Sequence, residues 1–264
     1  MLIFRIHNTM GQGEEVVSLF YIGTAIMLFL AFGLMFIVVT YQRHFFRMKR
    51  KEAENMLRVS LESEKNERAR IAADLHDGVS GDLSAIKNYL SVLAKKESEN
   101  QAIFDEIKEG VDTALQNTRA VSHNLMPPLL ETEGLVPALK NHLDNVGPKA
   151  QIEFEVIPNE VAELPPLVAY QLFRVLQELT TNMIKYGVVS QCEINLQQEK
   201  DSLKIEISDN GISFNFKENL AKPNASGLKN ITSRLHAIGG TIVQNEEKPK
   251  GNQFTITIKN INHA

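Results

Sequence analysis

The sequence predicts a chain in three parts: a single transmembrane helix, an α-helical hairpin that dimerises as a four-helix bundle, and an α+β sandwich. Three observations support this prediction. A long uncharged segment lies near the N-terminus, two apolar stripes at helical spacing follow it, and alternating strand patterns begin near residue 150. The net charge of −4 does not suggest direct nucleic-acid binding. The single cysteine, Cys192, excludes an intrachain disulfide and a thiolate zinc cluster.

The first element is an apolar segment without charges, from Val16 to Thr40. About 20 apolar residues are enough to cross a bilayer as a helix, so we predict a transmembrane helix over residues 16–41. A buried core helix is the alternative, and it would have to be unusually long and apolar on every side. Residues 1–15 are expected to form a short extracytoplasmic segment, because they are too few to fold as a ligand-binding domain.

Charges on the two sides of this segment predict its orientation. Glu14 and Glu15 precede it, and five basic residues follow it: Arg43, Arg47, Lys49, Arg50 and Lys51. Basic residues favour the cytoplasmic side of a membrane, so the N-terminus is expected outside and everything after residue 42 inside. The expected location is a bacterial-type cytoplasmic (inner) membrane, crossed once, with the lipid bilayer as a partner.

The second element is a helical region. Residues 42–68 are highly charged and contain no proline or glycine, which predicts a helical or coiled-coil linker. Two apolar stripes follow: Ala72, Leu75, Val79, Leu83, Ile86, Leu90 and Leu93, then Phe104, Ile107, Val111, Ala114, Thr118, Val121 and Leu125. A turn is expected at Ser98–Asn100, and Pro127 and Pro128 end the second helix. One hairpin leaves much of its stripe uncovered, so we predict that two copies pair over residues 69–147.

The third element is an α+β region. The sequence predicts strands at residues 152–156, 193–196, 203–207, 241–243 and 254–258. Helices are predicted from Pro165-Pro166 to about Tyr186, and from about residue 228 to 238. This order favours one sheet covered by helices. Gly147-Pro148 is the best boundary, which makes residues 148–264 a domain of their own.

One histidine stands beside the first apolar stripe. His76 lies in the sequence DLHD, about 100° from Leu75 on a helix, so its ring should face solvent. An exposed neutral imidazole is a competent nucleophile near neutral pH. A lone helical histidine is nevertheless most often an ordinary surface or packing residue.

Polar residues share a face of the helix predicted to end near Tyr186. Glu178, Asn182 and Lys185 are spaced four and three residues apart. A carboxylate and a carboxamide one turn apart supply oxygen ligands of the kind that Mg²⁺ prefers, and the lysine could reach phosphates. A solvated polar face with an incidental ion pair is the alternative.

Two short glycine-containing motifs complete the candidate residues. Asp209-Asn210-Gly211 follows an apolar strand, where the aspartate could accept a hydrogen bond from an exocyclic amine such as that of adenine and Gly211 could let the backbone approach a ligand. Asp-Asn-Gly is also an ordinary turn sequence. Ser226-Gly227-Leu228 opens a helix, where backbone N–H groups can bind phosphate.

In this order the motifs resemble the two-component sensor histidine kinases over about residues 66–260. The resemblance is strongest to the NarL-partner, DesK-like subclass, which has an acidic residue directly after the phosphoacceptor histidine. The stretch LMPPLLETEGLVPAL, residues 125–139, resembles the connection between the two domains in that subclass. No phosphate-binding P-loop motif G-x-x-x-x-G-K-[ST] occurs.

The resemblance implies roles for the candidate residues. His76 would be the phosphoacceptor and Asp77 would take or orient its ring proton. Glu178 and Asn182 would form the Mg²⁺–ATP box, with Asp209 as the adenine contact. Further ATP contacts are expected at Lys185, Gly211, Gly227 and Leu228. The implied fold is a Bergerat-type (GHKL) ATPase sandwich, the implied cofactors are ATP and Mg²⁺, and the implied partners are a second copy and a response-regulator receiver domain.

Three positions depart from the family pattern. Ser213 replaces a glycine near the ATP lid, Tyr186 replaces a histidine, and Gly81 stands where a glutamine or histidine often positions water for phosphatase action. A non-catalytic, membrane-tethered dimer that binds ATP or a partner is therefore the alternative function. A coiled-coil membrane scaffold would leave the ATPase-like half unexplained.

Overall fold

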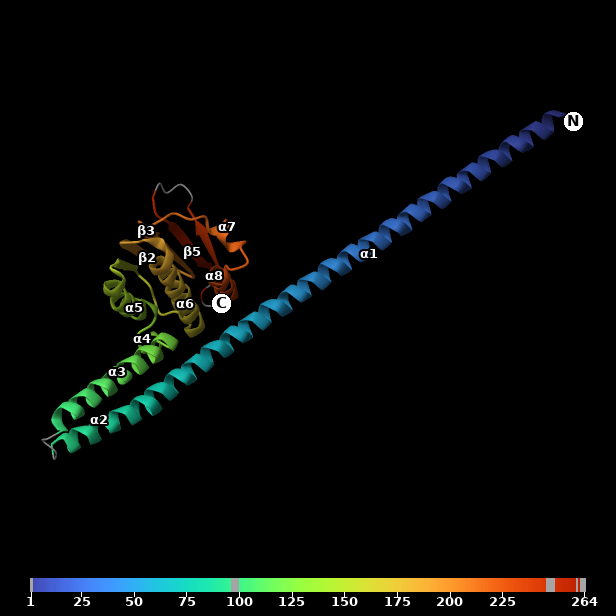
Figure 1. Ribbon diagram of the computed structural model, residues 1–264. Helices are drawn as coiled ribbons and strands as arrows, with labels where there is room; N and C mark the ends of the chain where they lie inside the picture. Colours follow the sequence, from blue (N-terminus) through green and yellow to red (C-terminus); the bar gives the residue numbers. More distant parts are fainter. Residues whose placement is uncertain (1, 96–99, 246–249, 260, 262–264) are drawn as a thin grey trace. The chain divides into compact units, whose positions relative to one another are not determined.

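The computed structural model describes residues 2–95, 100–245, 250–259 and 261. The chain divides into two compact units, Met1–Met56 and Leu57–Ala264. The first unit belongs to α1 (Leu2–Ala73), one uninterrupted helix (Figure 1). From residue 17 to 48, most of its large apolar side chains are exposed, among them Phe20, Leu28 and Phe36. By length and composition this helix can cross a membrane, and lipid would cover the exposed apolar surface.

The second unit begins with the last part of α1, which leads into the helical hairpin. After α1 the chain continues through η1 (Asp74–Val79), α2 (Ser80–Ala94) and α3 (Gln101–Leu125). The predicted helices are confirmed, but η1 is a turn of π-helix, which periodicity did not predict. Helix α3 ends at Leu125 as expected, because the two prolines after Met126 hold that residue in an extended conformation. Ser98 and Glu99, in the predicted turn, lie outside the described residues.

The apolar stripe of the hairpin remains half open. Ile86, Leu93, Ile107 and Val121 are between 45% and 51% exposed, although α2 and α3 pack against each other. Lys87 and Asp112 form an ion pair across the hairpin at 2.5 Å. A surface of this kind is typical of a helix pair that completes its core with another copy.

The rest of the unit is a sheet covered by helices. The strands are β1 (Glu153–Asn159), β2 (Gln191–Glu199), β3 (Ser202–Asp209), β4 (Gly240–Gln244) and β5 (Gln253–Lys259). Their order is β1-β2-β3-β5-β4, with β1 and β2 parallel and the other pairs antiparallel. The helices are α4 (Pro128–Thr132), α5 (Leu135–Ala150), α6 (Pro166–Asn182), η3 (Met183–Gly187), α7 (Phe216–Leu220) and α8 (Ser226–Ala237).

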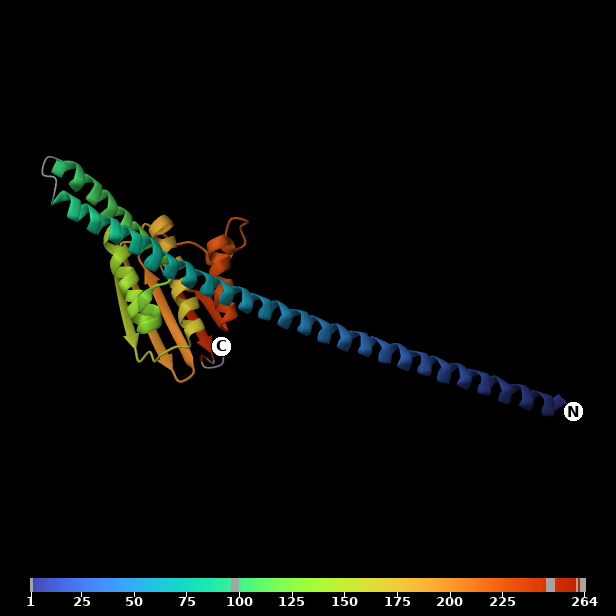
Figure 2. The same cartoon turned by 90° about the horizontal axis from the view of Figure 1, so that it is seen from below.

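The core lies between the sheet and helices α5, α6 and α8, which gather on one side of it (Figure 2). Alternate strand residues point inward, such as Leu196, Ile205 and Ile256, and all three are fully buried. They meet the apolar face of α6, where Leu172 and Val175 are also fully buried. The predicted strands and the predicted sandwich are therefore confirmed.

The predicted boundary at Gly147-Pro148 falls inside α5, which continues to Ala150. A Cβ atom on Gly147 would lie 2.8 Å from the carbonyl oxygen of Ile152, so glycine allows the chain to fold back tightly into β1. Leu139 of α5 is fully buried in the sandwich core. The division into residues 69–147 and 148–264 stays a prediction, and α5 packs with the part that follows that boundary.

Candidate active site

The first candidate site is the histidine in the π-helical turn. His76 is exposed, with 60% of its side chain accessible, as the sequence predicts. Its Nδ1 atom lies 3.0 Å from Oδ1 of Asp77. Adjacent side chains of an α-helix point apart, but the wider π turn reduces the angle between them. When Nδ1 carries the proton, its N–H donates a hydrogen bond to Asp77, and the lone pair of Nε2 faces outward as a nucleophile.

The second candidate site is a cavity of about 480 Å³ in the sandwich. It lies between the end of α6, η3, the start of α8 and the segment after β3. Its volume suits a ligand of nucleotide size. Six of the predicted residues line it: Glu178, Asn182, Lys185, Asp209, Gly227 and Leu228. The fold therefore brings predicted site residues from three separate segments of the chain to one cavity.

Asp209 is held at the wall of the cavity by its neighbours. It is 3% exposed, and its Oδ1 accepts a hydrogen bond of 2.9 Å from the backbone N–H of Gly211. The side-chain amide of Asn252 donates to Oδ2 of Asp209 at 3.2 Å and to the carbonyl of Ile212 at 3.0 Å. These contacts fix the carboxylate as an oriented acceptor.

Asn252 is a site residue that the sequence analysis missed. It is 3% exposed and lines the cavity, and its side-chain oxygen also accepts from the backbone N–H of Phe214 at 3.1 Å. It follows Gly251, whose φ of +79° leaves it close to the backbone of Asp209. A glycine-asparagine pair just before a strand was the available signal, but only the pairing of β3 with β5 brings it to Asp209.

Gly211 does not line the cavity. A Cβ atom there would lie 2.3 Å from the carbonyl oxygen of Gly187 and 2.6 Å from a methyl group of Val189. The next residue, Ile212, donates its N–H to the carbonyl of Gly187 at 2.7 Å. Glycine is needed here because two backbones approach each other, rather than because a ligand approaches the backbone.

Gly227 brings the start of α8 against the polar face of α6. A Cβ atom at this position would lie 2.3 Å from Oε1 of Glu178 and 3.7 Å from the side-chain nitrogen of Asn182. Glu178 and Asn182 offer oxygen donors one turn apart, which fits the donor preference of Mg²⁺. Among the described residues no group of three or more His, Cys, Asp or Glu forms a metal cluster, so a Mg²⁺ ion here would need phosphate oxygens and water as further ligands.

Positive charge lies at two places on the cavity wall. Lys185 lies in η3, where the π turn alters the four-and-three spacing expected for one face of an α-helix. Lys222, between α7 and α8, also lines the cavity, and the sequence analysis did not single it out. Tyr186 lines the cavity as well and is 74% exposed. The two lysines could bind an anionic group of a ligand.

Ser213 makes a specific contact at the position where glycine was expected. Its hydroxyl donates to the carbonyl oxygen of Gly251 at 2.7 Å. The contact joins the segment after β3 to the turn before β5, beside the residues that hold Asp209. The side chain therefore ties down the start of the segment that leads to α7.

Comparison with known proteins identifies the two parts. Residues 67–130 match the HisKA_3 family, described as histidine kinase, and residues 168–261 match the HATPase_c family of histidine kinase-, DNA gyrase B- and HSP90-like ATPases. The chain belongs to the sensor histidine kinases. His76 and Asp77 lie inside the first match, and the six predicted residues that line the cavity lie inside the second. A match to this ATPase family implies ATP binding.

Relatives of the chain include sensor histidine kinase LiaS of Bacillus subtilis, 28% identical over 224 residues, which are 80% of this chain and 58% of that protein. Sensor protein VraS of Staphylococcus haemolyticus is 30% identical over 67% of this chain and 50% of its own length. The chain spans about half the length of such relatives. A solved histidine kinase domain from Erythrobacter litoralis is 12% identical with a TM-score of 0.45, covering 72% of this chain and 94% of that one.

Proposed function

We propose that this chain is a membrane-anchored sensor histidine kinase that phosphorylates His76 from ATP and passes the phosphoryl group to an aspartate of a response-regulator receiver domain. The observation that carries the proposal is the contact between His76 Nδ1 and Asp77 Oδ1 in an exposed π turn. It orients one ring nitrogen as a proton donor and leaves the other free to react.

Binding of ATP follows from the residues of the cavity. Asp209 would accept a hydrogen bond from the exocyclic amine of adenine, while Lys185 and Lys222 attract the phosphates. Glu178 and Asn182 would hold Mg²⁺ together with phosphate oxygens. The ion supplies neutralisation of the phosphate charge, and the protein supplies positioning.

Phosphoryl transfer needs only two groups of the hairpin. The Nε2 lone pair of His76 attacks the γ-phosphorus, the bond to the β,γ-bridging oxygen breaks, and ADP leaves with that electron pair. Asp77 holds the Nδ1 proton and stabilises the positive charge that develops on the ring. A second transfer moves the phosphoryl group from Nε2 to a carboxylate oxygen of the receiver domain and restores the neutral imidazole.

The half-open stripe of the hairpin supports a homodimer. The exposed fractions of Ile86 and Ile107 are near one half in one chain, and a second hairpin would cover them. The basic residues that follow the apolar segment support an orientation with the N-terminus outside and both kinase domains in the cytoplasm. No direct contact with nucleic acid is proposed.

The test is phosphorylation of the full chain, reconstituted in lipid nanodiscs, with γ-labelled ATP and Mg²⁺. We expect acid-labile label on the wild-type protein and none on His76→Gln. His123→Gln is the matched control, since His123 is an exposed histidine of the same hairpin. If ATP binds but the wild-type chain takes up no label, the protein is a non-catalytic ATP-binding dimer.

A further inference from the structure

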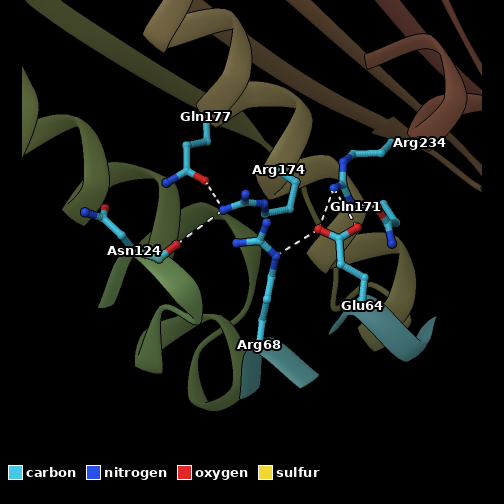
Figure 3. A network of polar contacts seen from close by, with 7 residues as sticks. All are labelled: Glu64, Arg68, Asn124, Gln171, Arg174, Gln177 and Arg234. Atoms are coloured by element: carbon cyan, nitrogen blue, oxygen red, sulfur yellow. Dashed lines mark hydrogen bonds and ion pairs between the residues drawn. The ribbon is translucent and has the colours of Figure 1, made fainter. Parts of the chain in front are cut away.

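A polar network joins the linker part of α1 to the two helices that build the nucleotide cavity (Figure 3). Arg234 of α8 donates from Nη2 to both carboxylate oxygens of Glu64, at 2.9 and 2.8 Å. Its Nη1 donates to Oε1 of Gln171 on α6 at 2.8 Å. The Arg234 side chain is only 12% exposed, so this ion pair is shielded from water on the side of α8.

Glu64 is charged in this network at neutral pH. Burial opposes its ionisation, but the hydrogen bonds and positive charges of Arg234 and Arg68 outweigh burial and lower its pKa. Arg68 donates to Glu64 at 2.8 Å within the same helix. The carboxylate is therefore shared between a guanidinium of its own helix and a guanidinium of α8.

Some polar atoms of this network have no hydrogen-bond partner. Two guanidinium groups contact the one carboxylate, and a third, that of Arg174 on α6, lies beside Arg68. Burial and the charges of Arg68 and Arg234 lower the pKa of Arg174. Among the described residues, Tyr170 Oη, Gln171 Nε2 and Arg174 Nε are buried without a hydrogen-bond partner. Each such atom carries a desolvation cost. The pairing is therefore expected to be reversible.

Both helices that contact the linker also carry cavity residues. On α8, Arg234 comes seven residues after Gly227, which is about 10 Å along the helix. On α6, Gln171 comes seven residues before Glu178. Two rigid helices thus have their nucleotide-binding residues at one place and their linker contacts about two turns away.

The docked arrangement does not present His76 to the cavity. The cavity lining comes entirely from residues 178–254, and His76 lies twelve residues beyond Glu64, roughly 18 Å along the helix. Phosphoryl transfer needs the reacting atoms about 3–3.5 Å apart. The ATPase part must therefore leave this position before it can phosphorylate the His76 of its own chain.

We propose that the Glu64–Arg234 ion pair is a latch that docks the ATPase domain on the linker helix and restrains phosphorylation of His76. Movement of α1 that separates the two side chains releases the domain. The latch presupposes the proposed kinase function and would regulate it. Glu64 lies on the same helix as the apolar segment, so a change at the membrane reaches the latch through continuous helix.

The test compares full-length wild type with Glu64→Gln, Arg234→Gln and the double variant in nanodiscs. Glu67→Gln is the matched control, because Glu67 lies on the same helix and pairs with Arg70 of that helix. Two quantities are measured: hydrogen exchange of residues 57–73, 166–182 and 226–237, and the initial rate of His76 labelling at saturating ATP. Nucleotide affinity checks that the cavity is intact.

Both single variants are expected to exchange faster and to label at roughly 5-fold the wild-type rate, since the loss of an interaction of this kind changes an equilibrium by that order. The double variant should label no faster than the single ones, because all three break the same pair. Three outcomes would overturn the latch: unchanged hydrogen exchange in the single variants, slower labelling of His76 in them, or a labelling rate in the double variant that multiplies the effects of the two single variants. Faster exchange in the three variants without label in any protein would retain the docking contact and reject the kinase function.

Discussion

The hairpin and the sandwich contain the same types of apolar residue but bury them to different extents. In the sandwich, Leu172, Val175 and Ile205 are fully buried within one chain. In the hairpin, Ile86, Ile107 and neighbours of the same stripe remain about half exposed. The difference teaches that the sandwich carries a complete core within one chain, whereas the hairpin does not, as expected of a helix pair that completes its core with another copy. Four predictions would break or sharpen this comparison.

The largest effect is expected from truncating the sandwich core. Leu172→Ala should cost about 2–5 kcal/mol of unfolding free energy at any protein concentration, because it leaves a cavity among fully buried side chains. Ile107→Ala in the hairpin should instead shift the midpoint of thermal unfolding only at concentrations where copies pair. Calorimetry over a dilution series separates the two. Equal, concentration-independent losses would contradict a hairpin that relies on a partner.

Removing the negative charge beside His76, the proposed phosphoacceptor, should affect chemistry alone. Asp77→Asn should lower the initial rate of His76 labelling by about 100-fold, because the amide no longer stabilises the charged ring. Binding of ATP, measured by fluorescent-nucleotide titration, should remain as in wild type, since Asp77 lies outside the cavity. Asp74→Asn, one turn away on the same segment, is the control. A wild-type rate would remove Asp77 from the mechanism.

A smaller effect is expected at the segment after β3. Ser213→Gly removes the hydrogen bond to the carbonyl of Gly251, worth about 0.5–1.5 kcal/mol. We expect faster hydrogen exchange over residues 213–225 and a slightly lower unfolding midpoint of the sandwich. Ser202→Gly at the far end of β3 controls for the loss of a hydroxyl. Exchange identical to wild type would show that the hydroxyl does not hold this segment.

The smallest effect concerns pH. Burial, and then the charge of Arg174, lower the pKa of His142, which packs edge-on against Phe173 with ring centroids 5.7 Å apart. The unfolded chain therefore binds more protons at this residue than the folded chain. Stability should fall as pH drops below the ordinary histidine value of about 6.5. His142→Gln should make the midpoint of thermal unfolding less dependent on pH between about pH 7 and 5.5. The variant His123→Gln, at an exposed site, should not change this dependence.

Much of the fold could be predicted because it rests on local periodicity. The stripes of the hairpin, the alternation in β3 and the proline that opens α6 each appear within a few turns of sequence. The π turns could not be predicted, because one extra residue in a turn leaves no periodic signal. Both lie at candidate sites: η1 brings Asp77 to His76, and η3 carries Lys185.

Contacts over long sequence distances were equally invisible. Asn252 reaches Asp209 only because β3 pairs with β5, and Arg234 meets Glu64 across 170 residues. At Gly211 the sequence identified the residue but not its neighbour. The sequence indicated a glycine that permits close approach, but only the fold shows that the neighbour is the backbone of Gly187.

Helix α8 carries Gly227 against Glu178 at one end and Arg234 against Glu64 two turns later. A binding energy that couples two sites acts equally in both directions. A nucleotide that displaces α8 would therefore change how readily the membrane segment adopts each of its states. The protein would then couple two inputs, because its response to movement of the membrane segment would depend on whether nucleotide occupies the cavity.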